Sequence, residues 1–447
     1  MKEEFRYIIM EWLARKLPET VERDVKINLN ADKVIAIAGV RRAGKTYLLF
    51  DTIKKLAETG VSRENVLYIN FDDDRLMNLT SRDLDDILSA YHELASPKKS
   101  VGIFLFLDEI QNVKNWDLWV RRIYDLKKYR IFITGSSSKL LSREIATSLV
   151  GRNITYVLYP FSFGEFLSAK GIKRGKDALY GEERHIINAL AKEYIMNGGF
   201  PETAFEADNE TKKKTVSAYY DAILYRDIIS RYRIEDANRL EMVFRYAINM
   251  YSSSFSTVKL YNYFKSQNLG ISRQTINNFV KFGEQTFLFY RLLQFFKGFK
   301  KSNQSRKKLY VVDNGIISLL ISNLEYGKLL ENAVLIELLR RKEKNPSMEI
   351  NYLNNKDGEV DFVISEGGSV AKLIQVTYEL DQKNMERELR PLITAMKDLK
   401  PKRSLLITFN AVDKAMAVEK GIETLTFVQW ALEAQDGKTS LRHRSRA

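Results

Sequence analysis

The sequence contains no cysteine and only three histidines in 447 residues. This excludes a disulfide framework, a Cys–His nucleophile pair and a Cys/His zinc site, so any metal must be held by carboxylate or phosphate oxygens. Long apolar runs are also missing, because stretches such as Val101–Leu107 end far short of the ~20 residues that a membrane-spanning helix needs. Glu3 and Glu4 stand where a signal peptide would be basic. We therefore expect a cytoplasmic protein.

Positive charge is in excess. Lysine and arginine number 71 against 57 aspartates and glutamates, a net charge of +14. This balance favours a polyanionic partner such as DNA, although the same excess can lie on a solvated surface. Hydrophobic residues make up 45% and charged residues 29% of the chain, as in soluble globular proteins, and the length suffices for two to four domains.

Short apolar strands alternate with helical stretches from Lys33 to Val157. The pattern predicts strands at 34–38, 66–71, 103–107, 131–134 and 154–158, and helices at 44–58, 81–94, 116–127 and 138–148. Strands separated by helices in this way form a parallel sheet covered on both faces. The first part of the chain is therefore predicted to be an α/β domain with a five-stranded parallel sheet.

The pattern changes after Pro160. Residues 162–232 are expected to be helical, with a break at the two glycines before Pro201. Helices are then predicted at 239–251, 258–267 and 272–283, followed by strands at 286–296 and 308–312 around a basic loop, which is the winged-helix order. The last block predicts a helix, three strands, a helix and a strand.

Residues 39–46 read Gly-Val-Arg-Arg-Ala-Gly-Lys-Thr and stand between a predicted strand and a predicted helix. This is the pattern and the context of a P-loop, whose backbone N–H groups surround the phosphates of a nucleotide. Lys45 would reach the β- and γ-phosphates, and the Thr46 hydroxyl would ligate Mg²⁺. The cofactors predicted are therefore ATP and Mg²⁺. The residues expected at the nucleotide are Gly39, Val40, Arg41, Arg42, Ala43, Gly44, Lys45, Thr46, Tyr47, Thr134 and Ser136.

A second motif supports the P-loop assignment. The apolar strand 103–107 delivers Asp108 and Glu109 at its C-terminal end, as a Walker B strand does. Asp108 would hold Mg²⁺ directly or through water, and Glu109 would polarise the attacking water. Thr134 and Ser136 follow the next strand and are expected beside the γ-phosphate in a sensor-1 role, with a plain turn as the alternative.

Several segments resemble a known family. They are the P-loop with its arginines and the segments 106–112 (Phe-Leu-Asp-Glu-Ile-Gln-Asn), 134–138 (Thr-Gly-Ser-Ser-Ser), 151–152 (Gly-Arg), 160–166 (Pro-Phe-Ser-Phe-Gly-Glu-Phe) and 198–202 (Gly-Gly-Phe-Pro-Glu). Together they look like the archaeal and bacterial AAA+-like ATPases that join a P-loop domain to a C-terminal DNA-binding and nuclease-like region. The resemblance implies that Arg152 is an arginine finger supplied to a neighbouring subunit, and hence a homo-oligomer. A local structural role for Arg152 remains the alternative.

The stretch 271–281 predicts an amphipathic recognition helix. Ile271, Ile276, Phe279 and Val280 can line one face. The outward side chains, which would contact phosphates and base edges of DNA, are Arg273, Gln274, Asn277, Asn278 and Lys281. The basic stretch 297–308 is predicted to be the wing, with Lys300, Lys301, Lys307 and Lys308 as further DNA contacts. The alternative is a winged helix that docks proteins.

The last block resembles the PD-(D/E)xK nuclease fold. Glu331 lies on its first helix, Asp361 ends Gly358-Glu-Val-Asp361, and a following strand contains Gln375. By this resemblance a metal would be held by Glu331, Asp361 and Gln375. Active members carry a lysine where this chain has Thr377, so cleavage is in doubt unless Lys356 or Lys372 substitutes. A DNA-binding fold that does not cut and an active nuclease both remain open.

These patterns predict a P-loop ATPase core at 1–160, a helical lid at 161–235, a winged-helix domain at 236–315, a restriction-endonuclease-like α/β domain at 316–435 and a basic tail at 436–447. The function predicted is that of a DNA-binding ATPase of the AAA+-like class, with Lys45, Glu109 and Arg152 as its catalytic residues. Two alternatives stay open: an ATP-regulated nuclease acting at DNA ends or junctions, and a nucleotide-operated signalling switch or scaffold.

Overall fold

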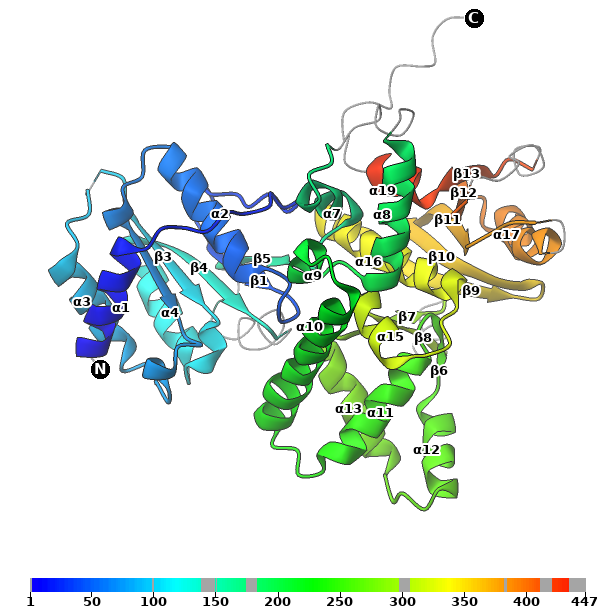
Figure 1. Cartoon of the computed structure of the whole chain (residues 1–447), viewed down its shortest axis with the longest axis horizontal. Coiled ribbons are helices and arrows are strands. Elements are labelled where there is room, and N and C mark those ends of the chain that lie inside the picture. Colours follow the sequence, from blue (N-terminus) through cyan, green and yellow to red (C-terminus); the bar gives the residue numbers. More distant parts are fainter. Residues whose placement is uncertain are drawn as a thin grey trace, which may run out of the picture. The chain divides into compact units, whose positions relative to one another are not determined.

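The structure is a computed structural model that describes residues 2–98, 100–137, 149, 151–173, 183–296, 306–381, 384–410 and 420–433. Two compact units make up the chain (Figure 1). The first contains residues 1–160 together with 284–287, and the second contains 161–283 and 288–447. Among the described residues, the helices are too short or too polar to cross a membrane. The helix predicted at 138–148 and the tail at 436–447 lie outside the described residues.

The first unit is built on a parallel sheet of five strands. The strands are β1 (Val34–Ala38), β2 (Val66–Asn70), β3 (Ile103–Asp108), β4 (Tyr129–Gly135) and β5 (Asn153–Val157), in the order β2-β3-β4-β1-β5. All neighbours run parallel, which confirms the predicted five-stranded parallel sheet. The C-terminal ends of β1, β3 and β4 therefore lie at the same edge of the sheet. Open α/β sheets bind their ligands at this edge.

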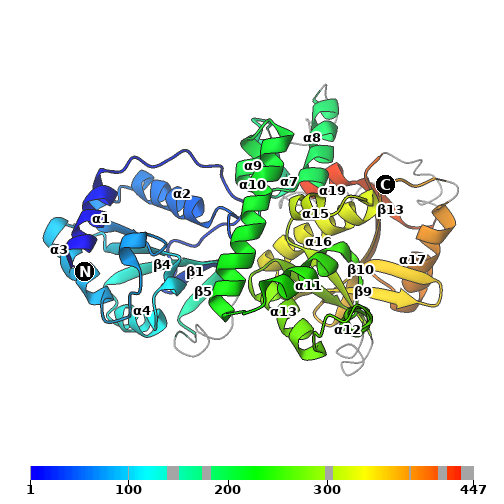
Figure 2. The same cartoon turned by 60° about the horizontal axis from the view of Figure 1, so that its bottom comes forward.

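Helices cover both faces of this sheet. They are α1 (Lys2–Ala14), α2 (Lys45–Glu58), α3 (Leu84–Leu94) and α4 (Trp116–Asp125). Figure 2 shows α1 and α2 on one face and α4 on the other. Aromatic rings fill the first interface: Tyr68 of β2 lies with its ring centroid 5.1 Å from Trp12 of α1 and 5.2 Å from Phe50 of α2. The apolar strands and amphipathic helices thus bury a shared core, as the sequence pattern predicts.

The second unit begins with helices. They are α7 (Phe163–Ala169), α8 (Arg184–Asn197), α9 (Pro201–Phe205) and α10 (Asn209–Asp221), which continues into a π-helical segment, Ala222–Ser230. Between α8 and α9 the chain turns at Gly198, whose φ is 77°. A Cβ atom there would lie 1.7 Å from Oδ1 of Asp313, so only glycine fits. Gly199 N donates to Asp313 Oδ2 at 2.7 Å and holds this turn in place.

Three helices and a small antiparallel sheet follow. The helices are α11 (Ala237–Asn249), α12 (Thr257–Ser266) and α13 (Arg273–Gln285), and the strands β6 (Ser253–Phe255), β7 (Phe289–Leu293) and β8 (Lys307–Val311) lie in the order β6-β8-β7. The predicted helices and the two later strands are present. Strand β6 was not predicted, and its pairing places β8 in the middle of the sheet.

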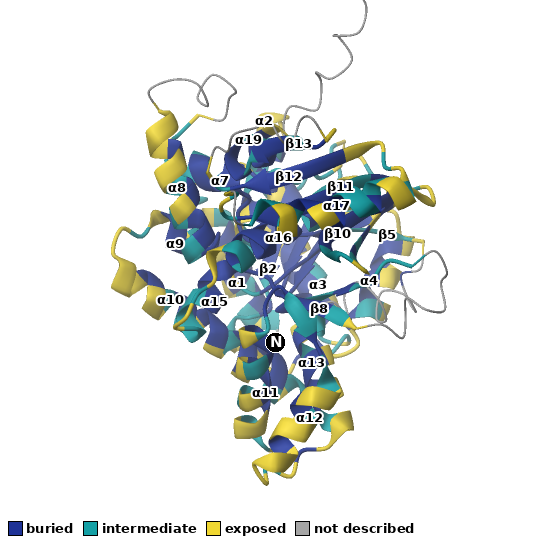
Figure 3. Cartoon of the chain, turned by 90° about the vertical axis from the view of Figure 1, so that its right-hand side faces the viewer, coloured by how far each residue is buried: buried dark blue, intermediate teal, exposed yellow. Residues whose placement is uncertain are grey.

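A second five-stranded sheet ends the chain. Its strands are β9 (Met348–Asn355), β10 (Gly358–Glu366), β11 (Ser369–Thr377), β12 (Arg403–Thr408) and β13 (Glu423–Thr426), in chain order across the sheet. The first three are antiparallel and the last three parallel. The helices of this part are α15 (Asn314–Leu320), α16 (Tyr326–Lys344), α17 (Met385–Leu399) and α19 (Phe427–Glu433). Leu389 and Leu392 of α17 pack on Val360 and Leu373, and Figure 3 shows these strands largely buried.

Candidate nucleotide-binding site and C-terminal carboxylate cluster

The loop after β1 has the backbone that a P-loop needs. Gly39 N donates to Gly135 O of β4 at 3.3 Å, and a Cβ at Gly39 would lie 2.1 Å from Leu158 O. Two positions have left-handed backbone, Arg42 with φ of 68° and Gly44 with φ of 94°. The loop then opens directly into α2. Its N–H groups are thereby gathered at the N-terminus of a helix, where phosphate binds.

Lys45 lies inside this loop. Its side chain is 4% exposed, and its ammonium donates to Gly39 O at 3.2 Å and to Val40 O at 3.3 Å. The same ammonium lies 3.2 Å from Oε1 of Glu109, which follows β3. The structure thus brings together the P-loop lysine and the Walker B glutamate, although β2 and α3 lie between them in the sequence.

Asp108 is fully buried and accepts three hydrogen bonds. Thr46 Oγ1 donates to its Oδ2 at 2.7 Å, Tyr68 OH donates to the same oxygen at 2.9 Å, and Thr134 Oγ1 donates to Oδ1. Burial raises the pKa of Asp108, and the nearby charge of Glu109 raises it further. The Thr46 hydroxyl and the Asp108 carboxylate are oxygen donors side by side, which is the donor set that suits Mg²⁺.

Glu109 has left-handed backbone, with φ of 53°. Its N–H donates to Thr134 Oγ1 at 2.9 Å, and Gln111 Nε2 donates to its carboxylate. Burial alone would raise the pKa of Glu109, but the charges of Lys45 and Arg41 outweigh it, and the pKa is lowered. Glu109 is therefore ionised at neutral pH, the form that can accept a proton or a hydrogen bond from water.

The other residues predicted at the nucleotide lie around these groups. Arg41 pairs with Asp72 at 3.3 Å, Ser136 is buried, and Tyr47 is 54% exposed on α2. Tyr68 was not predicted. It lies within the apolar strand β2, and only the pairing of β2 with β3 places its hydroxyl at Asp108.

Arg152 was predicted to be either an arginine finger or a residue with a local role. Its Nε lies 3.2 Å from Oδ1 of Asp125, and about a third of its side chain is exposed. This ion pair supplies a local partner, and the residue remains accessible from solvent.

The parallel sheet, the glycine loop after β1 and the acidic pair at the end of β3 define a P-loop domain. Accordingly, residues 31–167 match the family model of the AAA domain. Residues 188–326 and 326–430 match two models described as domains of unknown function, DUF8612 and DUF4143.

The chain is 37% identical over 435 residues to an uncharacterized protein of Methanocaldococcus jannaschii, covering 96% of this chain and 95% of the relative. An uncharacterized protein of Haemophilus influenzae is 31% identical over 409 residues, covering 90% of this chain and 95% of the relative. The chain belongs to the family of these proteins. Among solved structures, it is similar to the Aeropyrum pernix ORC1 protein in complex with DNA, with 12% identity, 75% of this chain and 94% of that chain covered, and a TM-score of 0.29.

The C-terminal region holds a second group of charged side chains, which we call the Lys308 cluster: Lys308, Glu331, Glu359 and Asp361. Lys308 is 1% exposed, and its ammonium lies 2.7 Å from Glu331 Oε1, 2.7 Å from Glu359 Oε1 and 3.5 Å from Asp361 Oδ1. The prediction that Lys308 contacts DNA from an exposed wing is therefore wrong. Its side chain faces the carboxylates of α16 and β10 instead of solvent.

The predicted metal site at Glu331, Asp361 and Gln375 also differs from the structure. Gln375 Nε2 donates to Glu388 Oε2 at 3.1 Å, while its buried Oε1 has no hydrogen-bond partner in the part of the chain that the structure describes. Lys308 lies among the carboxylates, and no group of three acidic or histidine side chains in the described ranges is arranged to hold a metal. The residues present therefore do not fit the Mg²⁺ that the nuclease resemblance implies.

Lys356 and Lys372 were named as residues that could substitute for the lysine missing at Thr377. Among the described residues, no ion pair joins either of them to Glu331 or Asp361, whereas Lys308 reaches both. Lys307 on the same strand is half-buried, and Lys300 and Lys301 lie outside the described residues.

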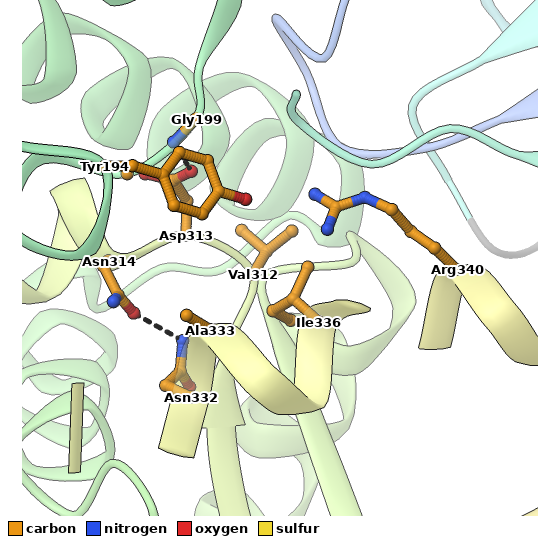
Figure 4. A pocket seen from close by; sticks show the side chains of 10 residues that line it. Tyr194, Gly199, Val312, Asp313, Asn314, Asn332, Ala333, Ile336 and Arg340 are labelled. Carbon is orange, nitrogen blue, oxygen red and sulfur yellow. Dashed lines mark hydrogen bonds between the residues drawn. The ribbon is translucent and has the colours of Figure 1, made fainter. Parts of the chain in front are cut away.

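A small cavity lies where Gly198 and Gly199 meet Asp313 (Figure 4). Its volume is about 10 Å³, the lower limit for one water molecule, so it cannot hold a nucleotide. Burial raises the pKa of Asp313 to about 7. Two other residues that line the cavity are joined by a hydrogen bond, in which Asn332 Nδ2 donates to Asn314 Oδ1 at 2.8 Å. We interpret the cavity as part of a polar junction between α8, β8 and α16.

Proposed function

We propose that this protein is a DNA-binding ATPase that hydrolyses ATP with Mg²⁺ and uses hydrolysis to change its conformation on DNA. The observation that carries the ATPase assignment is the meeting of Lys45 with Glu109 and of Thr46 with Asp108 at the ends of β1 and β3. Thr46 and Asp108 would hold Mg²⁺, which would neutralise charge on the phosphate oxygens.

The other residues of this site have separate tasks. Lys45 would bind the β- and γ-phosphate oxygens, which compete with Glu109 for its ammonium. Glu109 would accept a hydrogen bond from the water that attacks the γ-phosphorus, while the bond to the bridging oxygen breaks and ADP leaves. Thr134 holds both acidic residues, because it donates to Asp108 and accepts from the N–H of Glu109. Arg152 would add positive charge to the site of a neighbouring subunit in a homo-oligomer.

The proposal that DNA binds rests on α13. We propose that α11 to β8 form a winged helix in which α13 is the recognition helix. Ile271, Ile276, Phe279 and Val280 are buried. The exposed side chains of α13 include Arg273, Gln274, Asn277, Asn278 and Lys281. These groups bind phosphates and base edges when a helix enters a major groove, and the net charge of +14 adds a general attraction to DNA.

A helix followed by three antiparallel strands, a helix and a parallel strand supports a restriction-endonuclease-like fold for the C-terminal domain. In such a fold, Glu331 on α16 and Asp361 on β10 would be its acidic residues. We propose that this domain grips DNA without cutting it.

The test uses the full-length chain with Mg²⁺ and duplex DNA. Arg273→Ala combined with Lys281→Ala should weaken DNA binding on all sequences and lower the slope of log K against log salt by up to ~0.9 for each phosphate that the protein no longer neutralises. The matched control, Lys192→Ala with Lys213→Ala, removes the same charge from exposed positions of α8 and α10 and should leave the slope unchanged. If the two double variants lowered the salt slope equally, α13 would not be the part of the protein that contacts DNA. Absence of DNA binding at ~50 mM salt would contradict the DNA assignment and leave the ATPase assignment standing.

A further inference from the structure

The Lys308 cluster joins three elements. Lys308 comes from β8, Glu331 from α16, and Glu359 and Asp361 from β10. The ammonium of a lysine carries three N–H donors and no acceptor. Each of the three carboxylates lies within 3.5 Å of this nitrogen, so the ammonium has one acidic neighbour for each donor. Lys308 therefore stands at the centre of the three carboxylates.

The charges explain why a cation is needed here. With all groups ionised, three carboxylates and one ammonium would carry a net charge of −2. The side chains of Glu331 and Asp361 are 9% and 8% exposed, whereas that of Glu359 is 35% exposed and keeps access to water. Burial raises the pKa values of Glu331 and Asp361, and the nearby charge of Lys308 opposes this rise. Burial would lower the pKa of Lys308, but the surrounding carboxylates raise it well above its ordinary value, so the ammonium stays charged.

Further hydrogen bonds fix the acidic residues in place. Tyr310, two positions after Lys308 and on the same face of β8, donates from its hydroxyl to Glu331 Oε1 at 2.7 Å. Val376 N donates to Asp361 Oδ2 at 2.8 Å. Asn332, next to Glu331, bonds to the backbone N and O of Val311 at 2.9 and 2.8 Å. Strand β8 is therefore attached to α16 by both side-chain and backbone contacts around Lys308.

We propose that Lys308 is an internal substitute for a divalent cation: its ammonium permanently fills the cation position of the C-terminal domain and fastens β8 to that domain. A metal-dependent nuclease needs a metal with an open position for water or substrate. A buried ammonium offers no such position, and a phosphodiester cannot reach a nitrogen whose side chain is 1% exposed. The domain therefore does not cut DNA, and removal of the ammonium should create a divalent-cation site. This role of Lys308 does not depend on ATP hydrolysis.

The experiment measures Mn²⁺ binding to the full-length, nucleotide-free protein by electron paramagnetic resonance, together with thermal unfolding with and without Mn²⁺. The variants are Lys308→Met, Lys308→Met/Asp361→Asn, Asp361→Asn, and Lys307→Met as the matched control from the same strand. Comparison with and without Asp361→Asn assigns any bound ion to the cluster rather than to Thr46 and Asp108.

We expect Lys308→Met to melt at a lower temperature and to bind one more Mn²⁺ ion than the wild type, because three carboxylates lose their internal cation. Mn²⁺ should raise the melting temperature of this variant part of the way back to that of the wild type, and adding Asp361→Asn should abolish both effects. The wild type and Lys307→Met should show no Mn²⁺ binding that depends on Asp361.

Either of two results would overturn the proposal. One is a folded Lys308→Met protein that gains no Asp361-dependent Mn²⁺ site. The other is Asp361-dependent Mn²⁺ binding, or Mn²⁺-dependent cleavage of duplex or branched DNA, by the wild type, which would make Lys308 the lysine of an active nuclease. If Lys308→Met does not fold, the comparison of the wild type with Asp361→Asn decides the question.

Discussion

Replacement of Glu109 by glutamine tests the chemical step of the proposed reaction. The change keeps the size of the side chain and removes its negative charge. In the structure Glu109 is ionised, because the charges of Lys45 and Arg41 lower its pKa despite burial. An amide cannot accept a proton from water, and positioned acid–base groups contribute ~10²- to 10⁴-fold. We therefore expect Glu109→Gln to lower the rate of ATP hydrolysis by at least ~10²-fold.

ATP binding should respond differently. The Lys45 ammonium lies 3.2 Å from the Glu109 carboxylate, so it loses an ionic partner in Glu109→Gln and becomes more available to phosphate. The affinity for ATP should be unchanged or higher, whereas Lys45→Ala should weaken binding and turnover together. The assay is single-turnover hydrolysis of radiolabelled ATP beside equilibrium binding of a fluorescent nucleotide. Glu58→Gln, an exposed acid-to-amide change on α2, serves as the control and should change neither quantity.

Near-normal turnover in Glu109→Gln would refute this reasoning. It would mean that another residue orients the water and that the ion pair with Lys45 is structural. If ATP binding and ATP turnover fell together, the Glu109 carboxylate would serve to hold the P-loop in its conformation and not to position the attacking water. Only the separation of the two quantities supports the proposed role.

Three further predictions concern other positions. Arg152→Ala should lower ATP turnover by ~10²-fold or more if the arginine acts on a neighbouring subunit, and mixing it with Glu109→Gln protein should restore activity; turnover independent of protein concentration would contradict this. Gly198→Ala should destabilise the fold by more than ~2 kcal/mol in urea unfolding, since its Cβ would overlap Asp313 at a left-handed backbone position, and a smaller loss would mean that the turn can shift. The free energy of unfolding should fall as pH rises from about 4 to about 7, because folding raises the pKa of Asp313 from 3.8 to about 7 and the folded state holds the proton. Asp313→Asn should flatten this dependence of the free energy of unfolding on pH.

The sequence by itself determined the features that depend on neighbouring residues in the chain. The P-loop and the acidic pair were predictable, since a glycine loop between strand and helix, or two acids after an apolar strand, are local patterns. The parallel sheet and the outward face of α13 followed from the periods of strands and helices. Burial of Ile276 and exposure of Lys281 on that helix agree with this prediction.

Only the tertiary structure decided which distant groups meet. Tyr68 reaches Asp108 because β2 pairs with β3, and Asp313 requires Gly198 because β8 ends beside α8. Lys308 belongs to a basic stretch and was predicted to be exposed. Its burial follows from the packing of β8 against α16 and β10, which follow later in the chain and supply the carboxylates around it. The alternation of side chains along a strand identifies its two faces, but it does not identify the residues that each face packs against. For Lys308, the carboxylates packed against its face of β8 determine its role.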